Sequence, residues 1–329
     1  MELPLLKNNN RMKNRVTLFS KLNLTISILS LFCYLTAIAQ PENKSSLKQS
    51  DPSTKKQVND FIPDSKYGLV VTLSNLSEAL KNPTVYKSAR FTNSGLTDFP
   101  EQLFLFPNLV ELDISRNAIT VLPKRLNELK NLKELHLNKN RLTSLGNEIT
   151  SCSNLEVLQI QNNPLENISK EIGKMSNLKE LYIGEIAPNC SIPSELWNLT
   201  TLKKLRITNA NLKEIPNSIS EFKQLDELCL ANNSISEVPE GLYSLKNITY
   251  INLGYNKIKS LSSSIKTLEN LDYLGVYYNP LVKFPEEIEN LKKLTFLSCW
   301  KTKLPVAEIE KARKKLPLTK VLDTEVGIH

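Results

Sequence analysis

Histidine is almost absent from this chain: among 329 residues there are only two, His136 and His329. The sequence also lacks the H-E-x-x-H, phosphate-loop and G-x-S-x-G patterns, which are typical of zinc hydrolases, nucleotide-binding enzymes and serine hydrolases. Neither a metal site nor an activated nucleophile can be assembled from recognised parts. We therefore predict that the protein is not an enzyme.

Cysteine and glycine are also scarce. The five cysteines have no spacing typical of a zinc site. Glycine contributes only nine residues, while hydrophobic residues make up 40% of the chain, which excludes collagen-like and wholly disordered proteins. We expect no bound metal and no cofactor.

Half of the formal net charge of +8 lies at the start of the chain. Residues 1–39 contain five basic residues and one acidic residue; subtracting them from the totals of 42 and 34 leaves 37 basic and 33 acidic residues, a net charge of +4. Proteins that bind nucleic acid usually concentrate basic residues on one face. The balance of charge therefore argues against nucleic acid as a partner.

Residues 1–39 have the pattern of a signal peptide. A basic stretch reaches Lys21, the apolar run LNLTISILSLFCYLTAIA follows, and its last small residues precede Gln40. We predict an exported chain, periplasmic, at the cell surface or secreted, with no membrane span after cleavage. Two alternatives remain open: the 18-residue run is kept as an anchor, or the segment is no signal peptide and the protein is an intracellular scaffold.

The next segment, residues 40–67, is polar and has no apolar period. A segment without periodic apolar residues cannot bury enough surface to offset the entropy lost on folding. We predict that residues 40–67 form a flexible linker.

From Leu96 the sequence repeats every 23 residues. Block 96–118 reads LTDFPEQLFLFPNLVELDISRNA, and block 212–234 reads LKEIPNSISEFKQLDELCLANNS. The shared frame is L-x-x-L-P-x-x-I-x-x-L-x-x-L-x-x-L-x-L-x-x-N-x. Apolar positions 17 and 19 alternate with a variable position 18, which is the side-chain period of a β-strand. No single block can bury its apolar side chains, so the blocks must stack.

Over about residues 73–303 this frame resembles the leucine-rich repeat family in its 23-residue form, in an exported bacterial protein. The resemblance implies an α/β fold: a curved right-handed horseshoe solenoid of about ten repeats, with a parallel β-sheet on its concave side. We expect an N-terminal cap with a first degenerate repeat at 68–95, repeats at 96–303, and a C-terminal cap helix with a tail at 304–329.

Most blocks end in an asparagine whose amide can bond the backbone where the chain turns out of the strand. The residues that we interpret as structural for this reason are Asn117, Asn140, Asn163, Asn233, Asn256 and Asn279. Two consecutive blocks lack this asparagine, because Ile186 and Ala210 take its place. We predict a local change of curvature near 184–192.

The repeat positions keep the cysteines apart. Cys152 and Cys190 lie two rungs apart, and Cys229, which should point outward, lies three rungs from Cys299. Neighbouring strands are roughly 4.8 Å apart, whereas a disulfide needs Cα atoms within about 7 Å. We therefore expect free thiols.

Position 18 should point from the concave face, where side chains can vary without unfolding the protein. From the first rung these residues are Arg90, Asp113, His136, Gln159, Tyr182, Arg206, Cys229, Asn252, Gly275 and Ser298. The last four are small, which predicts a shallow strip. His136 lies beside Asp113, with Ser115 near, but an open sheet face gives a hydrolytic triad no oxyanion hole or closed pocket. We interpret Asp113 and His136 as a solvent-exposed salt-bridging pair.

Aromatic residues at positions 16, 20 and 21 should flank this strip. The predicted aromatic cluster consists of Tyr250, Tyr255, Tyr273, Tyr277, Tyr278, Phe296 and Trp300. Tyr and Trp on a rigid surface offer large contact areas at little entropic cost. We predict a non-enzymatic binding module with this cluster as its partner-binding site; a protein partner on the concave face is what the resemblance implies. Two alternatives remain open: the rings only pack on one another, or they bind a surface glycan.

Overall fold

The structure is a computed structural model that describes residues 65–324. The predicted signal peptide and most of the predicted linker lie outside these residues, so both stay predictions. Within 65–324, no helix combines the length and the apolar character needed to cross a membrane.

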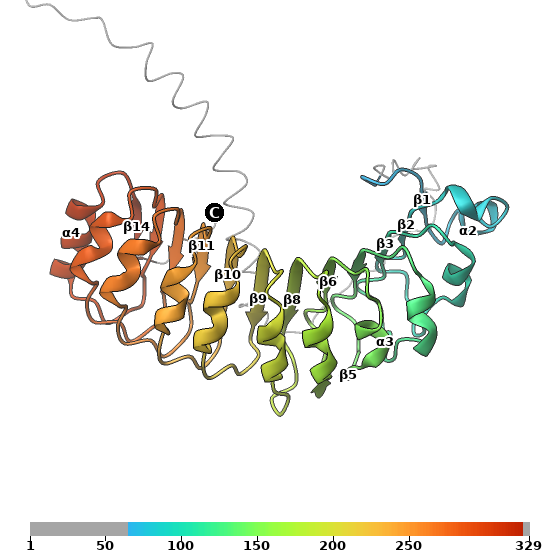
Figure 1. Cartoon of the computed structure of the whole chain (residues 1–329), viewed down its shortest axis with the longest axis horizontal. Coiled ribbons are helices and arrows are strands. Elements are labelled where there is room, and N and C mark those ends of the chain that lie inside the picture. The colour runs from blue at the N-terminus through green and yellow to red at the C-terminus, as the bar shows by residue number, and fades with distance from the viewer. Residues whose placement is uncertain (1–64, 325–329) are drawn as a thin grey trace, which may run out of the picture. The chain divides into compact units, whose positions relative to one another are not determined.

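The repeats form one parallel sheet of twelve strands along the inner side of an arc, as Figure 1 shows. Each block contributes one strand in a constant register, so that Leu112 pairs with Leu135 and Leu135 pairs with Leu158. This confirms the predicted solenoid with a parallel sheet on its concave side. The strands are β1 (Val70–Val71), β2 (Ser88–Arg90), β3 (Glu111–Asp113), β4 (Glu134–His136), β6 (Val157–Gln159), β8 (Glu180–Gly184), β9 (Lys204–Thr208), β10 (Glu227–Cys229), β11 (Tyr250–Asn252), β12 (Tyr273–Gly275), β13 (Phe296–Ser298) and β14 (Lys320–Leu322).

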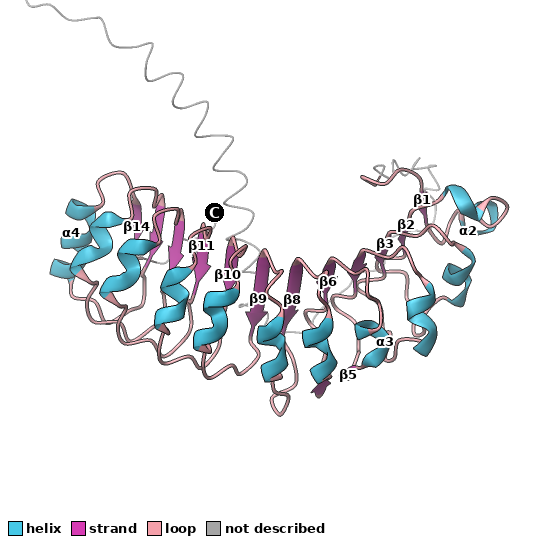
Figure 2. Cartoon of the chain, in the orientation of Figure 1, coloured by secondary structure: helices cyan, strands magenta, loops and turns pink. Residues whose placement is uncertain are grey.

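Short helices form the outer side of the arc (Figure 2). Most begin directly after the proline at position 5 of the block, which ends the extended segment because proline has no N–H to donate. The carbonyl of Pro100, for example, accepts a hydrogen bond from the Leu103 N–H at 3.0 Å. The 3₁₀ helices are η1 (Pro83–Val85), η2 (Glu101–Leu105), η3 (Lys124–Glu128), η4 (Lys170–Lys174), η5 (Ser194–Asn198), η6 (Asn217–Glu221), η7 (Glu240–Ser244), η8 (Ser263–Thr267) and η9 (Glu286–Asn290).

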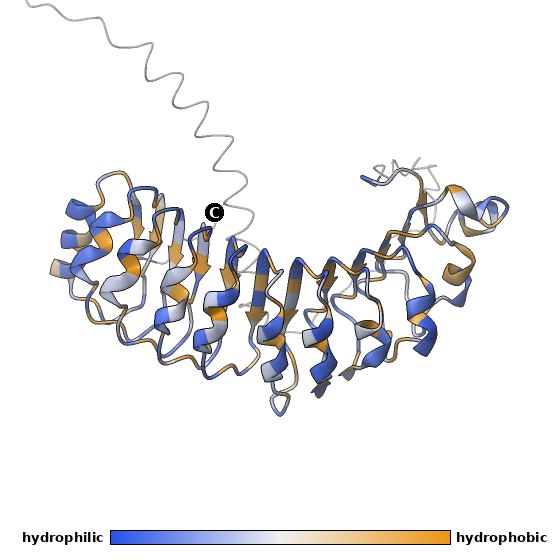
Figure 3. Ribbon diagram, viewed as in Figure 1, coloured by the Kyte–Doolittle hydropathy of each residue, from blue (hydrophilic) through white to orange (hydrophobic). Residues whose placement is uncertain are grey.

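The hydrophobic core lies between the sheet and the outer helices and continues from the first rung to the last. In the rung of β12, Leu274 and Val276 are buried from the sheet side and Ile265 is buried from η8. Figure 3 shows the same division, with hydrophobic bands along the strands and mainly hydrophilic residues on the outer helices. Every rung therefore buries its apolar side chains against two neighbours.

Where a block has the terminal asparagine, this residue joins consecutive rungs. The side-chain Nδ2 of Asn256 donates to the carbonyls of Leu230 (2.9 Å) and Leu253 (3.0 Å), and its Oδ1 accepts from the Ile235 N–H (3.0 Å). The residues with the same arrangement are Asn117, Asn140, Asn163, Asn233 and Asn279. Their structural role is confirmed.

The two consecutive rungs that have Ile186 and Ala210 in place of this asparagine use longer strands instead. β8 and β9 pair over five residues, and the last pair is Gly184 with Thr208. A Cβ on Gly184 would overlap Thr208, so only glycine allows the strands to stay together at this point. The change of curvature near 184–192 stays a prediction.

Two consecutive rungs lack the proline of position 5, and a second small sheet forms there. Gly146 and Ser169 replace it, and the Ser169 N–H donates to the Leu145 carbonyl at 2.8 Å, a bond that proline could not make. The outer elements of this region are β5 (Ser144–Leu145), β7 (Asn167–Ile168) and the one-turn helix α3 (Asn147–Thr150).

Both ends of the core are covered. At the start, β1 pairs with β2, and the short helix α2 (Leu76–Ala79) buries Ala79. At the finish lie the helix α4 (Val306–Lys315), within the residues 304–329 expected to form the C-terminal cap, and the strand β14, which pairs with β13. Hydrogen bonds from Lys311 and Lys315 of α4 lower the pKa of Glu286 on η9 to about 2.

The end of the predicted linker is ordered. Ser65 forms an antiparallel bridge with Gly68 and is only 5% exposed, and its hydroxyl donates to Glu111 on the sheet. The linker prediction is therefore wrong for residues 65–67, because polar side chains can hold a segment by hydrogen bonds without any apolar period. Residues 40–64 lie outside the described residues.

Asn256→Ala tests the asparagine contacts. It leaves the Ile235 N–H and the Leu230 carbonyl without their buried partner, at about 1–3 kcal/mol for each group. We expect the free energy of unfolding, measured in urea, to fall by about 3 kcal/mol. The matched control is Asn270→Ala, which removes two exposed bonds, one to the Lys246 carbonyl and one from the Lys293 ammonium, and should lower the free energy of unfolding by less than about 1 kcal/mol. Equal losses in the two variants would contradict this account.

Candidate functional site

Two rows of side chains run along the concave face of the sheet, the face that points away from the hydrophobic core. The position-18 row is continuous as predicted, because each member pairs in register with the next from Arg90 to Ser298. The position-16 row runs beside it. Its members are Ser88, Glu111, Glu134, Val157, Glu180, Lys204, Glu227, Tyr250, Tyr273, Phe296 and Lys320. The two rows divide the face into a charged half, β2 to β10, and an aromatic half, β11 to β13.

The charged half ends in a buried ion pair. The guanidinium of Arg206 on β9 binds the carboxylate of Glu227 on β10, and both side chains are less than a tenth exposed. The Arg206 guanidinium also lies 5.5 Å from the ring centroid of Tyr182, and the Tyr182 hydroxyl donates to Glu180 at 2.7 Å. Burial, together with the charge of Glu180, raises the pKa of Tyr182 well above its ordinary value. Breaking this pair is costly, because removing one member leaves a buried charge without its partner. The pair lies at the boundary between the charged half and the aromatic half.

The predicted pair of Asp113 and His136 does not form. Their strands are in register, but the Nε2 atom of His136 lies 3.9 Å from a carboxylate oxygen of Glu134 instead. Asp113 accepts a hydrogen bond from the N–H of Ser115 at 2.9 Å. No ion pair joins Asp113 and His136 in residues 65–324, because the Asp113 carboxylate folds back onto its own strand end.

The seven predicted aromatic residues do lie together, on β11, β12, β13 and the turns that follow. Four of them are buried: Tyr250, Tyr273, Tyr277 and Trp300 are 9%, 6%, 8% and 7% exposed. The other three, Tyr255, Tyr278 and Phe296, are half-buried. Four of the seven predicted residues are therefore largely covered, and, as expected, none of these four belongs to the core beneath the sheet.

The rings pack on one another in stacked pairs. Residues at the same position of adjacent rungs are about one strand spacing apart, which is a suitable distance for stacking. An edge contact joins two of the pairs, with the Tyr255 and Tyr277 centroids 5.7 Å apart at 90°. The stacked pairs are Tyr250 with Tyr273 (4.5 Å), Tyr255 with Tyr278 (4.0 Å) and Tyr277 with Trp300 (5.2 Å).

Glycines make room for these rings. A Cβ on Gly254 would overlap the ring of Tyr277, and a Cβ on Gly275 would lie 2.9 Å from the ring of Tyr273. The shallow strip expected from the small residues is therefore filled by tyrosine side chains. The sequence contains a signal for this packing, because a glycine next to a tyrosine leaves space that the tyrosine ring can occupy.

Tyr255 and Tyr278 occupy a left-handed turn position that recurs along the solenoid, with Lys139 and Lys301 among the other residues there. The φ angles of the two tyrosines are +52° and +50°, in the left-handed region, at a turn where Asn162 and Asn232 occupy equivalent places. Asparagine tolerates this region, whereas a bulky residue with a Cβ loses roughly 1–2 kcal/mol in it. Sequence reasoning missed this feature, although position 21 is asparagine in other blocks.

All four cysteines in residues 65–324 are buried, and none of them forms a disulfide there. Cys229, however, was expected to point outward and is fully buried within the position-18 row. Burial raises the pKa of Cys152 to about 11 and that of Cys299 to about 12.

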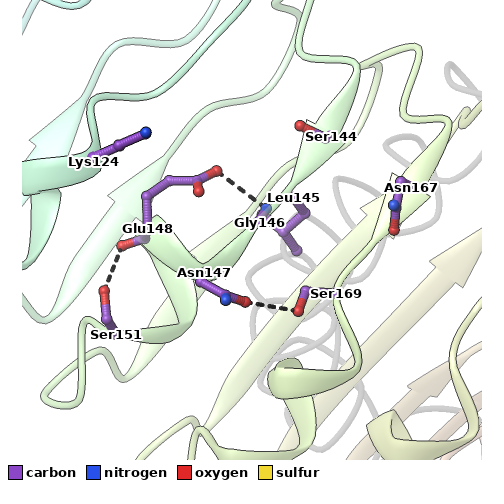
Figure 4. Close-up of a pocket in the computed structure, with 9 residues that line it drawn as sticks. All are labelled: Lys124, Ser144, Leu145, Gly146, Asn147, Glu148, Ser151, Asn167 and Ser169. Atoms are coloured by element: carbon purple, nitrogen blue, oxygen red, sulfur yellow. Dashed lines mark hydrogen bonds between the residues drawn. The ribbon is translucent and has the colours of Figure 1, made fainter.

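The outer side of the arc has a polar hollow of about 680 Å³ beside β5, α3 and β7 (Figure 4). The Glu148 carboxylate accepts from the Gly146 N–H at 3.1 Å, and the Asn147 side-chain oxygen accepts from the Ser169 hydroxyl at 3.0 Å. The lining groups thus bond mainly to one another, so this hollow is a weaker candidate site than the sheet face.

Two family models match the chain. The model described as "Leucine rich repeat" matches residues 130–185, 200–258 and 223–281, and the model described as "Leucine Rich repeats (2 copies)" matches residues 107–151. No curated protein matches the chain.

Among solved structures, the plant peptide hormone receptor RGFR1 in complex with RGF2 is 25% identical, with a TM-score of 0.59, covering 69% of this chain and 38% of its own. The Arabidopsis receptor kinase HAESA, in complex with the peptide hormone IDA and the co-receptor SERK1, has the same identity, TM-score and 38% share, and covers 65% of this chain. An internalin (inlF) from Listeria monocytogenes is 18% identical, with a TM-score of 0.54, covering 77% of this chain and 89% of its own, and shows the fold alone. The chain spans well under half the length of the two plant receptors.

Gly254→Ala tests the packing of the rings. The added methyl group forces Tyr277 away from Trp300, and we expect the free energy of unfolding to fall by about 1–3 kcal/mol with a changed near-ultraviolet circular dichroism spectrum. The matched control is Ala231→Gly, which changes one methyl group at the same position of the preceding rung. It should cost at most about 1 kcal/mol and leave the spectrum unchanged. An unaltered spectrum in Gly254→Ala would show that the rings are not packed as described.

Proposed function

The chain belongs to the leucine-rich repeat family, and from this premise we propose that it is a non-enzymatic binding module that holds a protein partner on the concave face of its sheet. The two plant receptors of this fold, solved in complexes with their partners, support such a role. The face also has the rigidity that recognition needs, because its side chains project from strands locked in one register.

The observation that carries this proposal is the choice of tyrosine at two turn positions, Tyr255 and Tyr278. The left-handed backbone itself recurs in rungs outside the aromatic cluster, for example at Arg116 and Lys139, so only the side chains distinguish these two turns. Asparagine at the same two positions would relieve the strain without disturbing the rung. The presence of two half-buried tyrosines there is explained if their rings are needed for contact with a partner.

The seven residues of the aromatic cluster then have two roles. The half-buried rings of Tyr255, Tyr278 and Phe296 contact the partner. The buried rings support them from the side and hold their orientation, so little entropy is lost on binding. The supporting residues are Tyr250, Tyr273, Tyr277 and Trp300.

A protein partner fits this surface better than a glycan. A sugar ring stacks on an open aromatic face, but Tyr255 and Tyr278 cover each other's faces at 4.0 Å, and Tyr277 covers Trp300 at 5.2 Å. The rings therefore present mainly edges and hydroxyls, which suit the apolar and polar side chains of a protein. Carbohydrate remains the second candidate, and saturable binding on a glycan array would favour it.

We propose that the chain is exported, on the strength of the basic and apolar segments of residues 1–39. Removal of this segment predicts Gln40 as the mature N-terminus, which mass spectrometry of the extracytoplasmic fraction would detect. A full-length chain confined to the cytoplasm would favour the intracellular scaffold instead.

The double variant Tyr255→Asn with Tyr278→Asn tests the binding role. The lost stacking, about 0.5–1.5 kcal/mol, is offset by relief of the left-handed strain, so the thermal midpoint should stay within a few degrees. Capture of protein partners from membrane and medium fractions should fall at least tenfold. A variant that captures the same partners as the unchanged protein would overturn the proposal.

Lys139→Asn is the matched control for this variant. Lys139 occupies the same turn position, with φ of +56°, five rungs before Tyr255, so the substitution relieves the same strain far from the aromatic cluster. It should leave partner capture unchanged. A glycan array with both proteins distinguishes the carbohydrate alternative.

A further inference from the structure

The chain enters the first rungs across the concave face, not at the end of the solenoid. We call residues Ser65–Tyr67 the strap. The Ser65 hydroxyl donates to a carboxylate oxygen of Glu111 on β3, and the Ser88 hydroxyl of β2 donates to Ser65 at 2.6 Å. The turn closes through the Gly68 N–H, which donates to the Ser65 carbonyl at 2.8 Å.

The strap then reaches β4. The Lys66 ammonium forms an ion pair with Glu134, and the Tyr67 hydroxyl donates to the same carboxylate at 2.7 Å. The Lys66 ammonium also lies 4.9 Å from the centroid of the Tyr67 ring. The hydrogen bond to Glu134 raises the pKa of Lys66, and burial followed by the Glu134 contact raises the pKa of Tyr67.

The strap occupies a surface that carries two neighbouring carboxylates. Glu111 and Glu134 are paired in register on adjacent strands, roughly 4.8 Å apart. Burial alone would raise the pKa of Glu111, but hydrogen bonds from Ser65 and Ser88 and the charge of Arg90 hold that pKa below its ordinary value. Two like charges so close together favour a positively charged neighbour, which the strap supplies with Lys66.

These contacts add little to the core. Neither Ser65 nor Tyr67 belongs to the hydrophobic core, and the first rung is already covered by β1 and α2. The strap is held by side-chain hydrogen bonds and one ion pair in which Lys66 is 62% exposed, and such surface pairs are weak. Release of the strap would therefore remove no residue from the hydrophobic core.

We propose that Glu111 and Glu134 form a second recognition site on the concave face, for an extended protein segment that presents a lysine next to an aromatic hydroxyl, and that the strap occupies this site as a built-in competitor. The strap shows by its own contacts what the site accepts. A tethered segment has an effective concentration on the order of millimolar, so a partner must bind more tightly than the strap or arrive with other contacts. The proposal rests on the concave face being the binding face, but it requires no contact with the aromatic cluster.

Trypsin measures how often the strap is released, because cleavage after Lys66 requires an open segment. We expect Glu134→Gln and Glu111→Gln in the full chain to raise the rate of cleavage at this bond about tenfold. The matched control is Glu180→Gln, which alters a carboxylate of the same row that the strap does not touch. Equal cleavage rates in all variants would show that these carboxylates do not hold the strap, and would overturn the proposal.

The second measurement asks whether the site accepts the same chemistry from outside. The probe is a peptide with the sequence SKYGLV, that of residues 65–70, titrated to several millimolar against the full chain carrying Lys66→Ala and Tyr67→Phe. We expect saturable binding that Glu134→Gln abolishes, that the peptide SEYGLV does not show, and that Tyr255→Asn with Tyr278→Asn leaves intact. Absence of saturable binding would overturn the proposal, while loss of binding only in the tyrosine variant would assign the peptide to the aromatic cluster instead.

Discussion

The structure depends on one constraint: every rung must satisfy its backbone groups through its neighbours. Asn256 shows how this works, since one amide serves carbonyls of two rungs and an N–H of the turn between them. An isolated block would leave these groups unpaired and its leucines exposed. Stacking in a single register is the consequence, and it decides which side chains form the core and which project from the sheet. Positions 16 and 18 are thereby free to differ from rung to rung.

Where a rung departs from the frame, the backbone finds another partner. The rungs with Ile186 and Ala210 in place of asparagine extend their strand pairing to Gly184. The rung with Ser169 in place of proline uses the extra N–H to form a bond on the outer side. In both places a local change of secondary structure gives the backbone groups new hydrogen-bond partners. The register of the sheet therefore continues through these rungs. A continuous sheet face is what allows separate sites to be held at fixed distances.

The period predicted which residues share a face, but it did not predict how deeply they are buried. Burial of Tyr277 depends on the absent side chain of Gly254 in the preceding rung, and such a relation between neighbours is invisible to a frame that treats each block alone. The sequence predicts a pair of His136 and Asp113 because their strands are adjacent. In the structure His136 lies beside Glu134 instead, two residues away on the same strand. The sequence does not predict the strap, because polar contacts between segments far apart in the chain produce no repeating pattern of residues.

The two ends of the concave face differ in what holds their side chains in place, and this difference bears on function. The aromatic half is held by ring stacking and by glycines that admit the rings, so it is rigid before any partner arrives. The charged half near β3 and β4 is held by an exposed lysine and by hydroxyl groups that water can replace. The buried pair of Arg206 and Glu227 lies between the two halves. A partner that spans the face would therefore meet a preformed surface at one end and an exchangeable one at the other.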